Sequence, residues 1–246
     1  MKLKDRVALV TGGRRLGAHV ATALATHGVD VSLSYQQSTE AAGRAAQQVH
    51  DAGRRALVTK ADVADSADVS NLIRRTVEEF GRLDIVVNMA SIYRNIPFDE
   101  LTDNAWRESM RVDLEGAYLC SRAAIPHMRS AGGGHIINFS DWTAASGRPR
   151  YKGFLPYYVA KRAVMGLTEG LALELAADDI AVNAIAPGPI IPPESLTQSE
   201  IEEVERATPL GRWGGGGEIA SAVVGLLQTD FVTGETIRVD GGRHLR

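Results

Sequence analysis

Short apolar runs alternate with segments of helical periodicity along the whole chain. The apolar runs are nearly continuous, which is typical of strands that are buried on both faces of a sheet. The expected strands are 6–10, 29–33, 56–58, 83–87, 135–139, 181–185 and 236–239. Between them, Ala-rich amphipathic segments predict helices at about 15–27, 38–52, 66–80, 103–130, 157–177 and 217–228.

This strand–helix alternation predicts an α/β fold with a doubly wound parallel sheet, the Rossmann fold. No repeat, linker or low-complexity tract interrupts it, so we expect a single domain over residues 1–246. One irregular stretch, at about 187–216, is rich in proline at its start and in glycine at its end. Because long connections in compact domains are usually functional, we expect a mobile substrate loop there.

Composition narrows the choice of partners. The chain has 246 residues, 44% of them hydrophobic, a net charge of -3 and no basic block. These features argue against binding to nucleic acid or to a membrane surface and favour a small-molecule substrate. No apolar run approaches the ~18 to 20 residues of a membrane span, and no signal peptide opens the sequence. We therefore expect a cytoplasmic protein, and the single cysteine, Cys120, fits a reducing compartment.

Tyr157 and Lys161 are the first candidates for chemistry. Residues at i and i+4 share one helix face, so the Lys161 ammonium can lie near the Tyr157 phenol and lower its pKa from about 10. A phenol tuned in this way can protonate an oxygen or nitrogen that has just received a hydride. Asp141, at the end of the preceding predicted strand, could orient that group, supply a second proton or only cap the next turn.

A glycine-rich turn, residues 11–17, follows the first predicted strand and opens a helix. This is where a doubly wound sheet binds a dinucleotide pyrophosphate on backbone N–H groups. The second predicted strand is followed by Gln36, with no acidic residue there to hold the ribose 2′-hydroxyl of NAD. Arg14 and Arg15 offer guanidinium groups suited to a 2′-phosphate. We therefore expect NADP(H) in preference to NAD(H), although the two arginines could also belong to a solvated turn.

Further motifs occur in order along the chain: Asp62-Val63, Asn88 to Ser91, Pro187-Gly188 and Val239 to Gly242. With the turn and the Tyr157/Lys161 pair, they resemble the short-chain dehydrogenase/reductase family over essentially the whole chain. The resemblance implies hydride transfer from a nicotinamide, with Tyr157 as proton donor and Lys161 also holding the nicotinamide ribose. It implies cofactor contacts at Gly12, Arg14, Arg15, Leu16, Gln36, Asp62, Val63, Asn88, Ala90, Ser91, Tyr157, Lys161, Pro187, Gly188 and Ile190.

Asp141 stands where most of the family has serine. In this, and in Arg15, Ser91, Tyr93 and the tail 241–246, the chain is similar to pteridine reductases and dihydromonapterin reductases. That similarity implies a flat heterocycle stacked on Tyr93. The implied catalytic residues are Asp141, Tyr157 and Lys161, and the implied substrate contacts are Arg15, Ser91, Tyr93, Asp141 and Tyr157.

The leading hypothesis is NADPH-dependent reduction of a pteridine-type C=N bond. One alternative keeps the fold and cofactor but reduces a 3-oxoacyl thioester, a sugar or another carbonyl compound. A non-catalytic NADP-binding sensor is a third hypothesis, but it would be expected to lose Tyr157 and Lys161, which are both present. We expect no metal site. By resemblance we expect a homo-oligomer, a tetramer or dimer, formed through the helices at 103–130 and 157–177.

Three features depart from the family pattern. The glycine-rich turn is shorter by one residue, so the separate roles of Arg14 and Arg15 stay open. Asp113 occupies a place where many members have asparagine for a proton relay. The segment between Asp141 and Tyr157 is longer by about three residues, with 148–152 inserted beside the expected substrate pocket.

Overall fold

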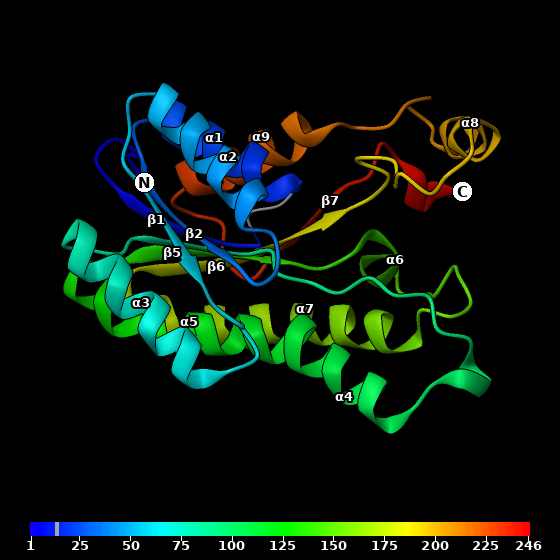
Figure 1. The fold of residues 1–246 in the computed structure, drawn as a ribbon, viewed down its shortest axis with the longest axis horizontal. Helices are drawn as coiled ribbons and strands as arrows, with labels where there is room; N and C mark the ends of the chain where they lie inside the picture. The colour runs from blue at the N-terminus through cyan, green and yellow to red at the C-terminus, as the bar shows by residue number, and fades with distance from the viewer. Residues whose placement is uncertain (13–14) are drawn as a thin grey trace.

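A computed structural model, which describes residues 1–12 and 15–246, shows a single α/β domain around a seven-stranded parallel sheet (Figure 1). The strands are β1 (Val7–Thr11), β2 (Asp30–Tyr35), β3 (Ala56–Lys60), β4 (Ile85–Asn88), β5 (Gly134–Phe139), β6 (Ile180–Pro187) and β7 (Thr236–Val239). Their order is β3-β2-β1-β4-β5-β6-β7, so the doubly wound sheet expected from the sequence is confirmed. Arg14 lies outside the described residues.

The strand order reverses at β1, which pairs with both β2 and β4. In the register of the sheet, Thr11 lies between Ser34 and Asn88, and Asn88 is paired in turn with Asn138. The carboxyl ends of these strands therefore meet at one edge. In open α/β sheets this is the edge where ligands bind.

Helices cover both faces of the sheet (Figure 1). One face carries α1 (Leu16–Thr26), α2 (Thr39–Asp51) and α9 (Gly216–Gln228), and the other carries α3 (Ser66–Phe80), α5 (Gly116–Ser130) and α7 (Leu155–Leu175). Each layer encloses its own apolar core, because successive side chains of a buried strand point to opposite faces. Within residues 1–12 and 15–246, no helix combines the length and apolar character that a membrane span needs.

Two helical regions differ from the sequence-based expectation. The helix expected at 103–130 is divided into α4 (Asp103–Met110), a π-helical turn η2 (Arg111–Glu115) and α5. The stretch 187–216 is not a loop throughout, because it contains α8 (Gln198–Ala207), which begins with a capping box between Thr197 and Glu200. A short helix that the periodicity did not indicate, α6 (Trp142–Ala145), follows β5.

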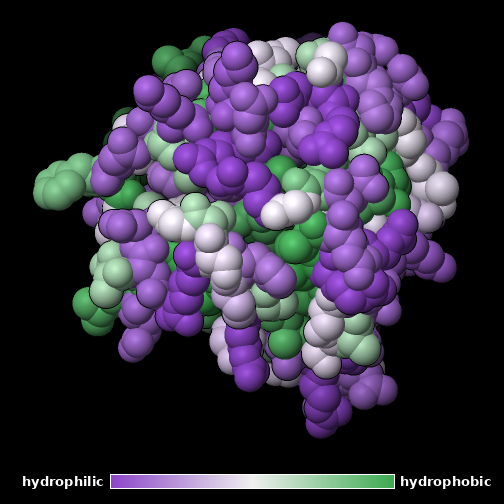
Figure 2. Space-filling model, turned by 90° about the vertical axis from the view of Figure 1, so that its left-hand side faces the viewer, coloured by the Kyte–Doolittle hydropathy of each residue, from purple (hydrophilic) through white to green (hydrophobic). Residues whose placement is uncertain are grey.

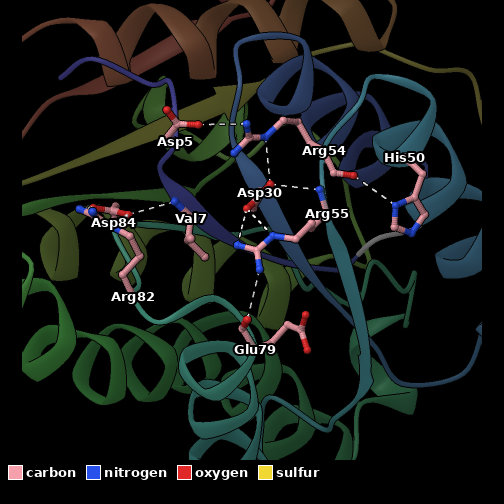
Figure 3. Close-up of polar contacts among 9 residues, drawn as sticks. All are labelled: Asp5, Val7, Asp30, His50, Arg54, Arg55, Glu79, Arg82 and Asp84. Carbon is pink, nitrogen blue, oxygen red and sulfur yellow. Dashed lines mark hydrogen bonds and ion pairs between the residues drawn. The ribbon is translucent and has the colours of Figure 1, made fainter.

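Charged residues form ion pairs at the amino ends of the strands, opposite the ligand-binding edge (Figure 3). Asp84 is fully buried, and Arg82 donates to both of its oxygens at 2.8 and 2.6 Å. Asp30 accepts hydrogen bonds from the side chains of Arg54 and Arg55 and from the backbone N–H of Arg55, at 2.7–3.0 Å. These buried carboxylates are paired, as buried charges must be, and they lie away from the ligand-binding edge.

The outer surface is mixed in character. Figure 2 shows the end that carries the N-terminus, where polar side chains cover most of the face and hydrophobic residues reach the surface near its centre. Large exposed apolar side chains, among them Phe98, Leu173, Leu210, Phe231 and Leu245, belong to five different segments. The homo-oligomer expected from the resemblance therefore stays a prediction.

Candidate active site

Tyr157 lies in the first turn of α7, where Pro156, the second residue of the helix, occupies a position that favours helix initiation. Its hydroxyl donates a hydrogen bond to Asp141 Oδ2 at 3.2 Å. The other oxygen, Oδ1, caps α6 by accepting bonds from the Thr143 backbone N–H at 2.7 Å and hydroxyl at 2.6 Å. Asp141 therefore caps a helix with one oxygen while its other oxygen faces the phenol, and its role as a second proton donor stays a prediction.

Lys161 lies one turn further along α7 and is buried. Its ammonium group donates to the Phe139 carbonyl oxygen at 3.0 Å and lies 3.5 Å from Asp113 Oδ1. The same nitrogen is 5.6 Å from the centroid of the Tyr157 ring. The i and i+4 spacing thus places Lys161 beside Tyr157 as expected, but its charge is paired with Asp113.

This pairing changes the expected electrostatics of Tyr157. Burial, followed by the carboxylates of Asp141 and Asp113, raises the pKa of Tyr157 well above its ordinary value of 10.0. The expectation of a lowered Tyr157 pKa is therefore wrong for this structure, because burial raises the pKa most, the carboxylates of Asp141 and Asp113 raise it further, and the Lys161 ammonium group is itself ion-paired. A phenol with a raised pKa holds its proton at neutral pH but is a weaker acid than one tuned toward neutral pH, so this charge balance does not by itself make Tyr157 a better proton donor.

Asp113 reaches the site from the π-helical turn η2, an irregularity that is frequent at functional sites. Its carboxylate is buried and accepts hydrogen bonds from the Ser91 hydroxyl, from the Ile92 backbone N–H at 3.2 Å and from the Ser109 hydroxyl at 3.1 Å. Asp113 therefore links the segment after β4 directly to Lys161. The sequence marked this position as unusual but did not show that it forms an ion pair.

The glycine-rich turn borders a cavity of about 440 Å³. Gly12 has a φ of 76°, and a Cβ atom there would lie 3.1 Å from the Ala90 backbone, so only glycine fits without strain. Thr11 Oγ1 fixes the facing segment by accepting from the N–H groups of Met89 at 3.0 Å and Ala90 at 3.1 Å. Four residues expected to bind the cofactor line the cavity: Gly12, Gln36, Asp62 and Ser91. Lining residues that sequence reasoning missed are Tyr35, Gln37, Ser38, Ala64, Ile92, Arg94, Glu108, Arg111 and Val112.

Other expected cofactor residues use their side chains in packing. The Asn88 amide donates to Asn138 Oδ1 at 2.9 Å and to Ser121 Oγ at 3.1 Å, joining β4 to β5 and α5. The Val63 side chain packs against Gly116, where a Cβ atom would come within 2.8 Å of Val63 Cγ2. Leu16 packs against the apolar core. These side chains therefore have packing roles in this structure, and Asn88 Oδ1 is buried without a hydrogen-bond partner among the described residues.

Arg15 bridges the glycine-rich turn and the segment after β6. Its Nη2 donates to the carbonyl oxygens of Ile191 at 3.1 Å and Pro192 at 3.2 Å. In this structure the Arg15 guanidinium is thus directed to the segment expected to cover the substrate. That orientation does not support a 2′-phosphate contact at Arg15.

The Pro187–Ile190 segment is held tightly. Gly188 donates to the Val239 carbonyl oxygen at 2.9 Å, and a Cβ atom on Gly188 would lie only 2.5 Å from Asp240 Cβ. Ile190 is buried and lines a further cavity of about 290 Å³ with Arg212 and Arg238. The end of β6 therefore has a fixed position next to the β7 strand.

A third cavity, of about 30 Å³, lies in front of Tyr157 and is rich in aromatic side chains. The Tyr93 ring stacks on Phe154 with centroids 4.5 Å apart and meets the Tyr157 ring edge-on at 4.8 Å. Three expected substrate residues, Tyr93, Asp141 and Tyr157, line this cavity together. The inserted segment 148–152, which the sequence placed beside the expected substrate pocket, supplies Pro149, Arg150 and Tyr151. Lining residues that sequence reasoning missed are Trp142, Thr143, Phe154 and Tyr158.

A parallel sheet with a cavity bordered by Gly12 at its switch point, beside a half-buried tyrosine and a buried lysine, defines a dinucleotide-dependent enzyme. A family model described as enoyl-(acyl carrier protein) reductase matches residues 12–244. The 3-oxoacyl-[acyl-carrier-protein] reductase FabG of Staphylococcus aureus is 35% identical, with 97% of this chain and 98% of the relative covered. The short-chain reductase protein NovJ of Streptomyces niveus is 39% identical, with coverage of 98% and 94%.

Solved structures agree with this relationship. A short-chain dehydrogenase/reductase from Serratia marcescens superimposes with a TM-score of 0.92 at 33% identity, covering 99% of this chain and 100% of the other. A short chain dehydrogenase from Burkholderia cenocepacia in complex with NADP has a TM-score of 0.91 at 31% identity, covering 99% of each chain. The chain belongs to the short-chain dehydrogenase/reductase family and is an oxidoreductase.

Proposed function

We propose that this protein is an NADPH-dependent reductase of carbonyl compounds. The observation that carries the proposal is the Tyr157 hydroxyl, hydrogen-bonded to Asp141 in the aromatic cavity. Ser91, which lines the glycine-bordered cavity, is joined through Asp113 to Lys161 beside that phenol. The names of the bacterial 3-oxoacyl reductases and the NADP complex of the Burkholderia structure support the same reaction and cofactor.

The residues divide the chemistry among them. Tyr157 donates a proton to the substrate oxygen, and its raised pKa means that the phenol carries this proton at neutral pH. Asp141 holds the phenol through Oδ2 while the Thr143 contacts fix the carboxylate. The Lys161 ammonium group is fixed by the Phe139 carbonyl oxygen and by Asp113, so it keeps a constant position beside Tyr157. Bound NADPH supplies the hydride.

The aromatic wall favours a substrate whose carbonyl is conjugated to, or part of, a planar ring. Tyr93, Tyr151, Phe154 and Tyr158 line the cavity with Trp142, and planar rings gain contact area on aromatic faces. A pteridine-type C=N bond is a second candidate. Asp141 favours it, because a carboxyl group beside Tyr157 can hydrogen-bond or protonate a ring nitrogen. At a carbonyl oxygen, a hydroxyl group usually has this role.

Initial rates of NADPH oxidation separate these substrates. We would compare isatin, a planar bicyclic ketone, with an acetoacetyl thioester and with dihydrobiopterin. The proposal expects turnover of a carbonyl substrate, at a rate above that of dihydrobiopterin. Turnover of the pterin alone would establish the second candidate, and NADPH binding without any turnover would indicate a non-catalytic protein.

The variant Tyr157→Phe tests the proton donor. Removing a general acid costs about 10²–10⁴-fold in rate, so kcat is expected to fall by that factor. The Kd for NADPH, followed by the fluorescence of the bound dinucleotide, should stay close to the wild-type value. An unchanged kcat would show that Tyr157 is not the donor.

A further inference from the structure

The C-terminal turn η4 (Arg243–Leu245) lies between two segments near the aromatic cavity. In Figure 1 this turn is drawn in red between α6 and α8. The segment 147–154, which connects α6 to α7, supplies several residues of the cavity wall. Helix α8 belongs to the long connection that follows β6.

Arg150 attaches the segment 147–154 to the tail. Its Nη1 donates to the Arg246 carbonyl oxygen, and its Nη2 donates to the His244 carbonyl oxygen at 3.3 Å. Arg150 Nε is buried without a hydrogen-bond partner among the described residues. A planar guanidinium group can hold two acceptors at once in a fixed geometry, which an ammonium group does less well.

Arg243 and Arg246 attach the tail to α8. Arg243 Nη1 donates to the carbonyl oxygen of Ala207, the last residue of the helix, at 2.6 Å, and Arg246 Nη1 donates to the Arg206 carbonyl oxygen at 3.0 Å. The last carbonyl groups of a helix lack partners within it and favour a nearby cation. The tail therefore caps α8 while it holds the segment 147–154.

Trp142 lies at the centre of this junction. The guanidinium carbons of Arg150 and Arg243 are 5.4 and 5.8 Å from its ring centroid, within the range of a cation–π contact. Trp142 is buried and forms part of the cavity wall, and the Tyr151 ring meets it edge-on at 6.4 Å. A further contact, between His244 Nδ1 and Asp240 Oδ2 at 2.7 Å, fixes the tail to the end of β7.

We propose that Arg150, Trp142 and Arg243 form a positioning layer that determines substrate specificity, by fixing the wall of the cavity in front of Tyr157 against the C-terminal turn. The layer keeps Trp142 and Tyr151 in place for a planar substrate. Arg243 does not line the cavity and acts through these aromatic side chains, so it is a positioning residue. Arg150 fixes the same side chains and also borders the cavity itself. The proposal rests on the proposed function for its kinetic readout.

The variants Arg150→Gln and Arg243→Gln test the layer in the full-length protein. With isatin and NADPH, each is expected to raise KM about tenfold, the effect of losing roughly 1.4 kcal/mol of binding, while kcat stays within about twofold of the wild type. The acetoacetyl thioester, a narrower substrate, should be affected less. Arg148→Gln, at an exposed arginine of the same segment, is the matched control and should leave KM unchanged. Arg150→Lys should restore only part of the wild-type KM, because lysine keeps the positive charge but lacks the planar guanidinium group that binds two acceptors at once.

A substrate-independent readout accompanies the kinetics. The Trp142 contribution to fluorescence, obtained by difference from Trp142→Phe, should shift in Arg150→Gln and not in Arg148→Gln. If Arg150→Gln and Arg148→Gln had the same KM and the same emission, the proposal would be overturned. A fall in kcat together with a rise in KM, equal for both substrates, would also overturn it. If the wild-type protein reduces neither carbonyl compound, the proposed function fails, and the emission shift alone then decides whether the layer exists.

Discussion

At the scale of single residues, local spacing predicted which groups meet but not their charge balance. The separation of Tyr157 and Lys161 by one helical turn places both in one site, and Asp141 at the end of β5 joins them. The ion pair of Lys161 with Asp113 depends on a different helix. Long-range packing creates that contact and also buries the Tyr157 phenol, and burial is the largest cause of its raised pKa. Local spacing shows neither, so it predicts the wrong direction for this pKa.

The variant Asp141→Ser tests the electrostatic role of this carboxylate. Serine also caps helices well, so α6 should persist while one of the groups that raise the Tyr157 pKa is removed. The Tyr157 pKa should fall, so the phenol loses its proton at a lower pH. Alcohol oxidation needs the phenolate, so its rate at a fixed neutral pH should rise. The rate of reduction falls as the phenol loses its proton with rising pH, and in the variant this fall should begin at a lower pH than in the wild type. Profiles of kcat/KM against pH in both directions measure this, and profiles identical to the wild type would contradict it.

At the scale of elements, strands and most helices were predictable because their periodicity is a local property. The turn η2 was not, since one π-helical turn hardly disturbs the apolar periodicity of 103–130. Helix α8 carried a signal that was overlooked, the Thr197 and Glu200 capping box. Helix α6 has only four residues, too few for any periodicity.

The junction between β6 and β7 gives a prediction at this scale. In Gly188→Ala the new methyl group would meet Asp240 Cα and Cβ at 2.6 and 2.5 Å, so the backbone must move. Overpacking of this kind typically costs about 1–3 kcal/mol, which urea unfolding would measure.

Gly43→Ala is the matched control, because Gly43 lies on an exposed face of α2 and a methyl group added there would have nothing within 4 Å. Alanine is a better helix former than glycine, so this variant should gain about 0.5–1 kcal/mol. Equal unfolding midpoints for the two variants would show that the contact at Gly188 is relieved without cost.

At the scale of the whole molecule, the order of the motifs was sufficient to predict the fold and family but not the substrate. The cavity wall depends on contacts between the segment 147–154 and a tail that lies far away in sequence. Contacts of that range leave no periodic signal in either segment. The inserted residues could therefore be located, but not the wall that they build.

The amino edge of the sheet predicts how the whole domain responds to acid. Burial alone would raise the pKa of Asp30, but hydrogen bonds from Arg55 and the charges of Arg54 and Arg55 hold it below 3.8. A lowered pKa contributes stability above the unfolded-state value, and this contribution is lost as the pH falls through the folded-state value. Arg55→Gln should therefore lower the unfolding free energy by about 1 kcal/mol at neutral pH, with the difference shrinking in acid.

Urea unfolding at neutral pH and below the ordinary aspartate pKa would measure this difference. Arg74→Gln, which removes an exposed i,i+4 pair with Glu78, is the control and should change the unfolding free energy by no more than about 0.5 kcal/mol. An Arg55→Gln effect of equal size at both pH values would point to lost packing rather than to lost charge pairing.

The position of the C-terminal turn also decides where the protein can be tagged. If the C-terminal turn positions the cavity wall as proposed, a purification tag fused directly after Arg246, whose carbonyl oxygen Arg150 binds, is expected to alter the substrate preference. The amino group of Met1 lies on another part of the molecule, bound to Leu227 and Asp230. Kinetic work should therefore use an N-terminal tag, or one that is removed without residue at the C-terminus.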